Sequence, residues 1–395
     1  MRRILFINTD MCAGGIEVSL LNLLDRLDLS KYDISLLLLS DNLSFLNRLP
    51  NEVHKILFSR NMEAYKKSWG GYCRRIIEAV FQKNKRNIVD KISLRLLIPF
   101  EEKLYIRFIV NRLSQSFDVV IAYRLGLSAK LASVLSGGII DILFFHSGAI
   151  QSSANERKQL LQANHVVSVS EGIRQLLLHA YPQLSSSTII TIHNLINIKY
   201  IREQANIQSH PALLQNGTSI IVSCGRLVHE KGFDLLLNAM SLLKHRGENC
   251  VLIIVGGGDN SKYDKVLYHI AEDLGLTVEK DIFFVGDQKN PYCYMKMANI
   301  YVQPSRYEAF GLTIREAQVL GRPVIATKTV GANLLIRDGE TGILCDPSPT
   351  SLAVNISCLM HNSEMCDLLS SNCLKSDFDV LNREALISFE TLLQA

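Results

Sequence analysis

Apolar runs without polar interruption alternate along the chain with segments whose apolar positions repeat at helical spacing. Uninterrupted runs are typical of strands that are covered on both faces, and their alternation with helices indicates a parallel sheet. In the first half we expect strands at 2–8, 32–40, 117–123, 141–146, 165–170 and 187–193.

A polar stretch at 206–219 interrupts this pattern, and its Pro, Gly and Asn are typical of a linker. Further strands are expected at 219–225, 249–258, 281–286, 298–305 and 322–328. Because 395 residues are too many for one ordinary core, we predict an α/β protein with two doubly wound, Rossmann-like domains that face each other across a cleft. The predicted domains are 1–205 and 206–375, followed by a helical tail at 376–395, and we expect the helices after 351 to close the second domain.

The composition is that of a globular protein, with 48% hydrophobic and 20% charged residues. The chain starts with only a four-residue apolar run before Asn8, which favours a buried strand over a signal peptide. No window approaches eighteen uninterrupted apolar residues, so we expect no spanning helix. The nine cysteines are scattered without a C-x-x-C pair, which indicates small core residues in a reducing cytosol and predicts a cytoplasmic protein.

Positive charge is concentrated between Lys55 and Arg112, where 14 Lys and Arg face 5 Asp and Glu, although the net charge of the whole chain is only +4. This region (55–112) holds the single tryptophan, Trp69, and ends in a segment with apolar residues at helical spacing: Leu104, Tyr105, Phe108, Ile109 and Leu113. A basic amphipathic segment with an aromatic anchor suits an anionic membrane surface. A helix face that packs on its own domain fits equally well. No nucleic-acid recognition motif accompanies the charge, so we expect no nucleic-acid partner.

Glycines follow two predicted strands at the edge where doubly wound sheets bind ligands. Gly14 and Gly15 open a helix, so their N–H groups could face a phosphate. The G-x-G-x-x-G fingerprint is absent, and such pairs also occur in turns that bind nothing. The three glycines at 256–258 allow close approach of a ligand or merely a tight turn.

Cations and a histidine follow other predicted strands. Arg226 and Lys231 flank the loop that opens a helix near 233. Two cations beside a helix N-terminus form a good receptor for a diphosphate, although surface charges at a loop are the simpler interpretation. His146 ends a predicted strand, and a lone histidine is more often a satisfied polar group than a catalyst.

The stretch SRYEAFGLTIREAQ, from Ser305 to Gln318, carries two glutamates around a glycine step. Glu308 is expected in the loop after a strand and Glu316 in the first turn of the following helix. Thr313 and Glu316 also fit a capping box, which would explain Glu316 structurally. The capping box leaves Glu308 unexplained, so Glu308 is expected at the cleft.

The only D-x-D pattern is Asp377-Phe378-Asp379, a pattern that some sugar transferases use to hold a divalent cation. It follows no predicted strand, so we interpret it as turn or helix-cap residues and expect no metal.

Several stretches resemble the family-4 retaining glycosyltransferases of the GT-B fold, the glycosyl transferases group 1. They are GRLVHEKGFDLLLNA, YVQPSRYEAFGLTIREAQVLGRPVIAT and VGANLLIRDGETGILCDP, with weaker likeness in GGIEVSLLNLL and TIHNLIN. The resemblance consists of specific motifs over 219–347. Before 219 it is limited to the general pattern of the sequence. It implies transfer of a sugar from a nucleotide-diphosphate donor with retention of configuration, without a metal or further cofactor.

The resemblance also implies roles for individual residues. Arg226 and Lys231 would hold the diphosphate, Glu308 would contact the donor sugar, and Glu316 would bind the ribose hydroxyls. Close to the phosphates and the sugar it places a further set: Gly14, Gly15, His146, Phe310, Gly311, Leu312 and Thr313.

Together with the basic region, the resemblance suggests a glycan or lipid-linked glycan acceptor at the inner face of the cytoplasmic membrane, as in O-antigen, capsule or lipopolysaccharide biosynthesis. The family also includes enzymes with soluble products. A nucleotide-sugar epimerase and a non-catalytic sugar-nucleotide-binding protein of the same fold remain the alternatives.

Overall fold

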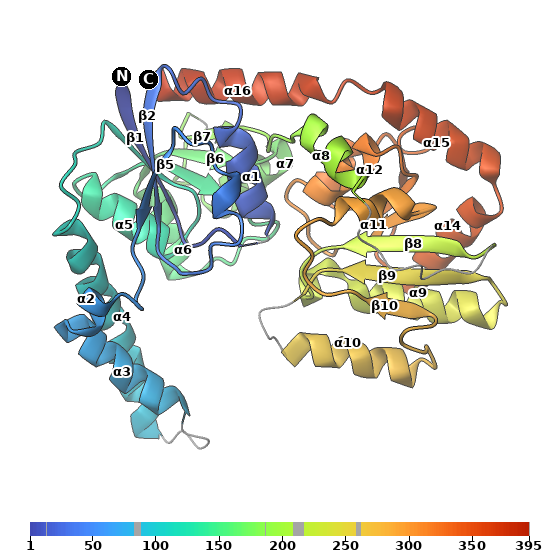
Figure 1. Cartoon of the computed structure of the whole chain (residues 1–395), viewed down its shortest axis with the longest axis horizontal. Coiled ribbons are helices and arrows are strands. Elements are labelled where there is room, and N and C mark those ends of the chain that lie inside the picture. The colour runs from blue at the N-terminus through green and yellow to red at the C-terminus, as the bar shows by residue number, and fades with distance from the viewer. Residues whose placement is uncertain (13, 83–87, 186, 208–216, 258–261, 395) are drawn as a thin grey trace.

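The computed structural model describes residues 1–394 except 13, 83–87, 186, 208–216 and 258–261, and it contains two parallel sheets with helices on both faces (Figure 1). The first sheet has the order β3-β2-β1-β4-β5-β6-β7. Its strands are β1 (Arg2–Asn8), β2 (Tyr32–Leu38), β3 (His54–Leu57), β4 (Val119–Ala122), β5 (Ile140–Phe145), β6 (Ala163–Ser168) and β7 (Ile189–Thr191).

The second sheet has the order β10-β9-β8-β11-β12-β13, and each pair of neighbouring strands is parallel. Its strands are β8 (Ser219–Cys224), β9 (Cys250–Val255), β10 (Ile282–Phe284), β11 (Ile300–Gln303), β12 (Val324–Thr327) and β13 (Ile343–Cys345). The prediction of two doubly wound α/β domains is therefore confirmed. The predicted linker at 206–219 lies mostly outside the described residues.

Helices connect the strands and cover the sheets. Helices of the first half accompany the first sheet: α1 (Gly15–Leu24), α2 (Glu63–Lys66), α3 (Trp69–Gln82), α4 (Ile88–Val110), α5 (Leu127–Leu135), α6 (Ala154–Leu161) and α7 (Glu171–Ala180). After β8 follow α9 (Phe233–His245), α10 (Lys262–Asp273), α11 (Tyr292–Met297), α12 (Leu312–Val319), α13 (Val330–Leu335), α14 (Pro349–Met360), α15 (Ser363–Lys375) and α16 (Asp379–Gln394). The helix before β8, α8 (Ile198–Ala205), packs on α11 and α12 of the second domain.

The central strand β1 shows why an uninterrupted apolar run forms a strand here. Its side chains alternate between two cores, with Leu5 and Ile7 in one and Ile4 and Phe6 in the other. Because both faces are covered, every one of these positions is apolar.

The last helix corrects one expectation about the C-terminal region. We expected all helices after 351 to close the second domain, but α16 runs back to the first domain (Figure 1). Phe389 joins the core of β1 and β2, with its ring 6.2 Å from that of Phe6. The side chain of Asn382 accepts a hydrogen bond from the backbone nitrogen of Ile196 and donates one to its carbonyl oxygen, both at 3.0 Å. The tail is therefore a strap between the domains.

The basic region is divided between core and surface. Tyr105, Phe108 and Ile109 of α4 are buried in the first domain's core, and Leu113 packs against it. For this face the simpler interpretation, packing on its own domain, is correct. The basic stretch at 83–87 lies outside the described residues. Within the described residues, no helix is long and apolar enough to cross a membrane.

Candidate functional site

The loop after β8 presents Lys231 to the end of β11. Lys231 ends a single-turn 3-10 helix, His229–Lys231, and Gly232 follows it with φ of 67°. A side chain at Gly232 would place its Cβ 2.0 Å from the carbonyl oxygen of Pro304, so the close approach of the two loops requires glycine. The loop is therefore fixed against the stretch that carries Glu308.

Lys231 and Glu308 form an ion pair, with Nζ 2.6 Å from Oε2. Both side chains are mostly shielded from solvent, and the hydroxyl of Ser305 lies 3.3 Å from the same oxygen. A charge-assisted contact of this length in a shielded place is stronger than a surface ion pair. Two residues that sequence patterns assigned to one site, 77 positions apart, are thus in direct contact.

A second pair clamps the same two loops, and sequence reasoning missed it. Arg306 binds Asp234 through two parallel contacts of 2.7 and 2.6 Å, and it also donates to the carbonyl oxygen of His229 at 2.8 Å. The guanidinium holds the pKa of the Asp234 carboxyl below its ordinary value although burial opposes this. In the sequence, the only indication of this Arg306–Asp234 pair is that each of the two motifs carries one charged residue of opposite sign.

Helix α12 begins differently from the capping box. Gly311, with φ of 90°, precedes Leu312 as the first helical residue, without a side-chain cap. Thr313 instead donates to the side-chain oxygen of Gln303 at 2.9 Å. Glu316 therefore lies in the second turn rather than the first, and the capping-box interpretation is wrong.

Glu316 is buried, with 5% of its surface exposed. It accepts one hydrogen bond from the Tyr292 hydroxyl, at 3.1 Å. Burial raises the pKa of this carboxyl to about 7, although Tyr292 and Arg48 act in the opposite direction. A buried carboxyl with a raised pKa is characteristic of functional sites.

The stretch from Glu308 to Leu312 lies against the first domain. Phe310 is part of that domain's core, and the Ser170 hydroxyl donates to the carbonyl oxygen of Ala309 at 2.8 Å. A Cβ on Gly148 would lie 3.0 Å from the backbone nitrogen of Glu308. A Cβ on Gly15 would lie 3.8 Å from a methyl group of Leu312. The structure thus brings the glycine pair and the glutamate stretch to one interface.

His146 and Arg226 make fewer polar contacts than the other predicted site residues. His146 follows β5 and stacks on Phe144, with centroids 5.7 Å apart, and its Nε2 is shielded without a partner among the described residues. Burial, with a smaller contribution from Arg124, lowers its pKa to about 3, so the ring is neutral. Arg226 is exposed and forms no ion pair within the described part of the chain.

The D-x-D residues are engaged in structural contacts. Asp377 accepts from the backbone nitrogen of Asp379 at the start of α16 and pairs with Arg383 at 2.9 Å. Asp379 pairs with Arg26 of the first domain at 3.1 Å. These contacts agree with turn and cap residues.

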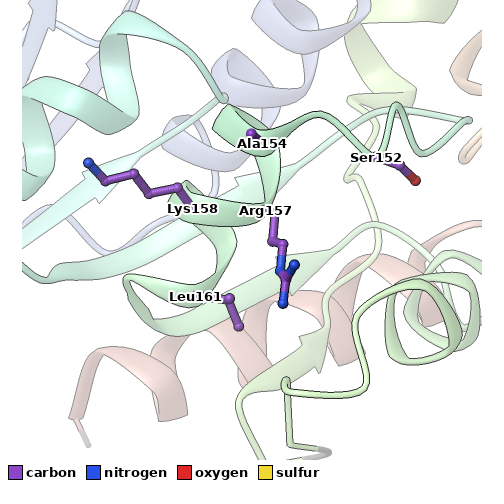
Figure 2. A pocket seen from close by; sticks show the side chains of 5 residues that line it. All are labelled: Ser152, Ala154, Arg157, Lys158 and Leu161. Atoms are coloured by element: carbon purple, nitrogen blue, oxygen red, sulfur yellow. The ribbon is translucent and has the colours of Figure 1, made fainter.

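An open pocket of about 490 Å³ lies elsewhere, on α6, and shares no residue with the predicted site (Figure 2). Its lining residues are Ser152, Ala154, Arg157, Lys158 and Leu161.

Comparison with known proteins identifies the second domain. Residues 206–375 match the family model Glycosyl transferases group 1. A D-inositol 3-phosphate glycosyltransferase of Corynebacterium glutamicum is 37% identical over 155 residues, which are 37% of this chain and 36% of the relative. The capsular polysaccharide biosynthesis glycosyltransferase CapM of Staphylococcus aureus is 24% identical over 225 residues, 55% of this chain and 57% of the relative. The chain therefore aligns with roughly a third to somewhat over half of the length of these relatives.

The fold of the whole chain also has counterparts. The crystal structure of Anabaena HepE in complex with UDP-glucose superposes with a TM-score of 0.71, covering 99% of this chain and all of that one at 17% identity. At this identity the likeness concerns the fold, and it shows that the two domains are arranged as in the GT-B fold.

Proposed function

Because residues 206–375 match the family model Glycosyl transferases group 1, we propose that the chain is a retaining glycosyltransferase of this family. It moves a sugar from a nucleotide-diphosphate donor to a hydroxyl of a glycan acceptor, without a metal. The observation that carries this proposal is the Lys231–Glu308 pair, because it joins the cation suited to a diphosphate with the carboxylate suited to a sugar.

The pair has a simple chemical use. When the bond to the anomeric carbon breaks, positive charge develops on the sugar ring and negative charge on the departing diphosphate. Lys231 and Arg226 stabilise the diphosphate, and fixed cations are effective there because they need no reorganisation during the reaction. An arriving diphosphate competes for Lys231, which frees Glu308 to accept hydrogen bonds from the sugar.

The neutral ring of His146 limits its role. With a pKa of about 3, the imidazole carries no proton to give to the leaving group near neutral pH. It is suited to a hydrogen bond with the donor sugar. The leaving phosphate then takes the proton of the acceptor hydroxyl, and the acceptor is held on the same face of the sugar by closure of the domains.

The experiment that tests the proposal is a panel of nucleotide sugars with membrane extract as the acceptor, scored by nucleotide release. The wild type should release nucleotide from one or a few donors only when the extract is present. Lys231→Ala should lower release at least about 100-fold, whereas the control Lys199→Ala should not, because Lys199 is exposed and its pair with Glu203 measures 3.9 Å. Release without added acceptor, or no release from any donor, would contradict the proposal.

The acceptor that we propose is a lipid-linked intermediate of bacterial surface polysaccharide synthesis, such as O-antigen, capsule or lipopolysaccharide. Support comes from helix α3, which projects with α4 away from the first sheet (Figure 1). Its side chains Trp69, Tyr72 and Ile76 are exposed, Trp69 by 64%. The rings of Trp69 and Tyr72 stack at 5.2 Å. Exposed aromatic rings beside cations suit the interface of an anionic membrane.

Vesicle binding tests this surface. Near an anionic membrane each Lys or Arg contributes about 1 kcal/mol, so reversing four charges should weaken binding by more than about 100-fold. The changes are Lys66→Glu, Lys67→Glu, Arg74→Glu and Arg75→Glu. Sedimentation with phosphatidylglycerol vesicles measures the loss, and pure phosphatidylcholine vesicles are the control. Equal binding of wild type and variant would exclude a membrane role for the surface formed by α2 and α3.

A further inference from the structure

A buried line of polar side chains runs from the end of β11 to Glu308. Gln303 is the last residue of the strand, and Ser305 follows two positions later; their surfaces are 1% and 0% exposed. The amide nitrogen of Gln303 donates to the Ser305 hydroxyl at 2.8 Å, and that hydroxyl lies 3.3 Å from Oε2 of Glu308. On the other side of the amide, the hydroxyls of Tyr301 and Thr313 donate to the Gln303 oxygen at 2.8 and 2.9 Å.

The partners of Gln303 fix the direction of this line. An ionised carboxylate can only accept, so the Ser305 hydroxyl donates to Glu308. The Ser305 oxygen then accepts from Gln303, which requires the amide nitrogen on this side and the amide oxygen on the other. With the amide reversed, Ser305 would donate to Gln303 and leave Glu308 without this hydrogen bond. The line therefore delivers one hydrogen-bond donor to Glu308.

Both ends of the line are attached to regular structure. Tyr301 belongs to β11 and is fully buried, and Thr313 lies in the first turn of α12. The Thr327 hydroxyl of β12 donates to the carbonyl oxygen of Ser305, which fixes the backbone there as well. Buried polar networks whose members are satisfied make their surroundings rigid. The Ser305 hydroxyl is therefore held in one place relative to the second sheet.

The two oxygens of Glu308 have different surroundings. Lys231 and Ser305 contact the same oxygen, Oε2. Within the described part of the chain no hydrogen bond or ion pair reaches Oε1, which leaves Oε1 for a ligand. In the proposed reaction the diphosphate draws Lys231 away, and Ser305 then remains to hold Oε2. A carboxylate without this contact would turn about its side-chain bonds and lose its alignment with the substrate.

We propose that Gln303 and Ser305 are positioning residues, which hold the Glu308 carboxylate in place for the donor sugar once Lys231 has turned to the diphosphate. Both are buried, so they act through Glu308 and do not touch the substrate. Gln303 sets the direction, because its amide presents an acceptor to one side and a donor to the other. This inference rests on the proposed function, because it concerns the carboxylate of that same site.

Turnover measures the effect of the line. Ser305→Ala removes the hydroxyl from Glu308 and leaves Lys231 in place. With a donor that the nucleotide-release panel identifies, kcat should fall at least about tenfold, whereas the dissociation constant for the donor should change less than about threefold. An unchanged kcat, or a loss of donor affinity that accounts for the whole effect, would overturn the proposal.

Two more variants make this test specific. Ser223→Ala, on the neighbouring strand β8, is the matched control, because its hydroxyl is equally buried and has no partner among the described residues. It should keep the kcat of the wild type. Gln303→Met cannot donate to Ser305, so it should lower kcat as Ser305→Ala does, and it carries the test if Ser305→Ala does not fold. The two changes together should lower kcat little more than either alone, because both break one line; additive losses would contradict this.

Crystal structures test the inference without turnover. Lys231→Ala imitates the state in which the lysine has left Glu308 for the diphosphate. The Glu308 carboxylate should keep its orientation in Lys231→Ala and lose it when Ser305→Ala is added. A carboxylate that keeps its place in the double variant would overturn the inference at any level of turnover. If the carboxylate behaves as expected but the wild type consumes no donor, the positioning of Glu308 stands and the proposed function fails.

Discussion

Glu316 gives the sharpest quantitative prediction, because its burial has a measurable cost. Its pKa of about 7 in the folded protein compares with 4.5 for an ordinary glutamate. Each pKa unit corresponds to about 1.4 kcal/mol, so this residue alone changes the free energy of unfolding by about 3 kcal/mol. The folded state favours the neutral acid. The contribution of Glu316 to the free energy of unfolding is therefore most favourable below pH 4.5, and it falls as the pH rises to about 7.

Replacing Glu316 with Gln removes this pH dependence and keeps an oxygen for the Tyr292 hydroxyl. The free energy of unfolding of the variant should therefore rise relative to that of the wild type between pH 5 and 8. For a domain of this size 1 kcal/mol shifts the Tm by about 2–4 °C, so the advantage should grow by roughly 6–12 °C. Circular dichroism melts of the ligand-free protein measure it, and the exposed Glu340→Gln is the control. A Tm difference that stays constant from pH 5 to 8 would refute the reasoning.

Three further predictions concern the loops that meet at the end of β11. Lys231→Ala should reduce turnover at least about 100-fold with an unchanged circular dichroism spectrum, and near-normal transfer would contradict its diphosphate role. Glu308→Gln should lower kcat more than it weakens donor binding in calorimetry, whereas an unchanged rate would remove Glu308 from the site. Arg306→Ala and Asp234→Ala should each lower kcat about tenfold, and the double variant little more, because both break one clamp; additive losses would speak against it.

Most strands could be predicted from the sequence because β1 and its central neighbours are covered on both faces. The strands that were missed are β3 and β13. The sequence of β3, His54-Lys55-Ile56-Leu57, is half polar because this edge strand is largely exposed. Strand β13 has only three residues and its apolar run ends with them, whereas the apolar positions of the equally short β7 and β10 continue to Ile192 and Val285. Edge position and short length weaken the pattern from which strands are predicted.

In the candidate site, the sequence predicted proximity better than local conformation. Lys231 and Glu308 were expected near each other, and they touch. The T-x-x-E pattern at Thr313 suggested a helix start that the left-handed Gly311 displaces. Glu17 was not singled out beside the glycine pair, because its burial is a property of the folded chain. The Arg306–Asp234 clamp was missed for a similar reason, since its residues are 72 positions apart.

The strap formed by α16 also restricts how the domains can move. The chain passes from the first domain to the second near Ile196 and returns just before α16. Asn382 binds Ile196 directly, so the two crossings lie side by side. Two adjacent crossings define one hinge axis between the domains. The domains can rotate about this axis, whereas twisting and sliding of one domain against the other are restricted. Each opening should therefore return Glu308 to the same place opposite the first domain.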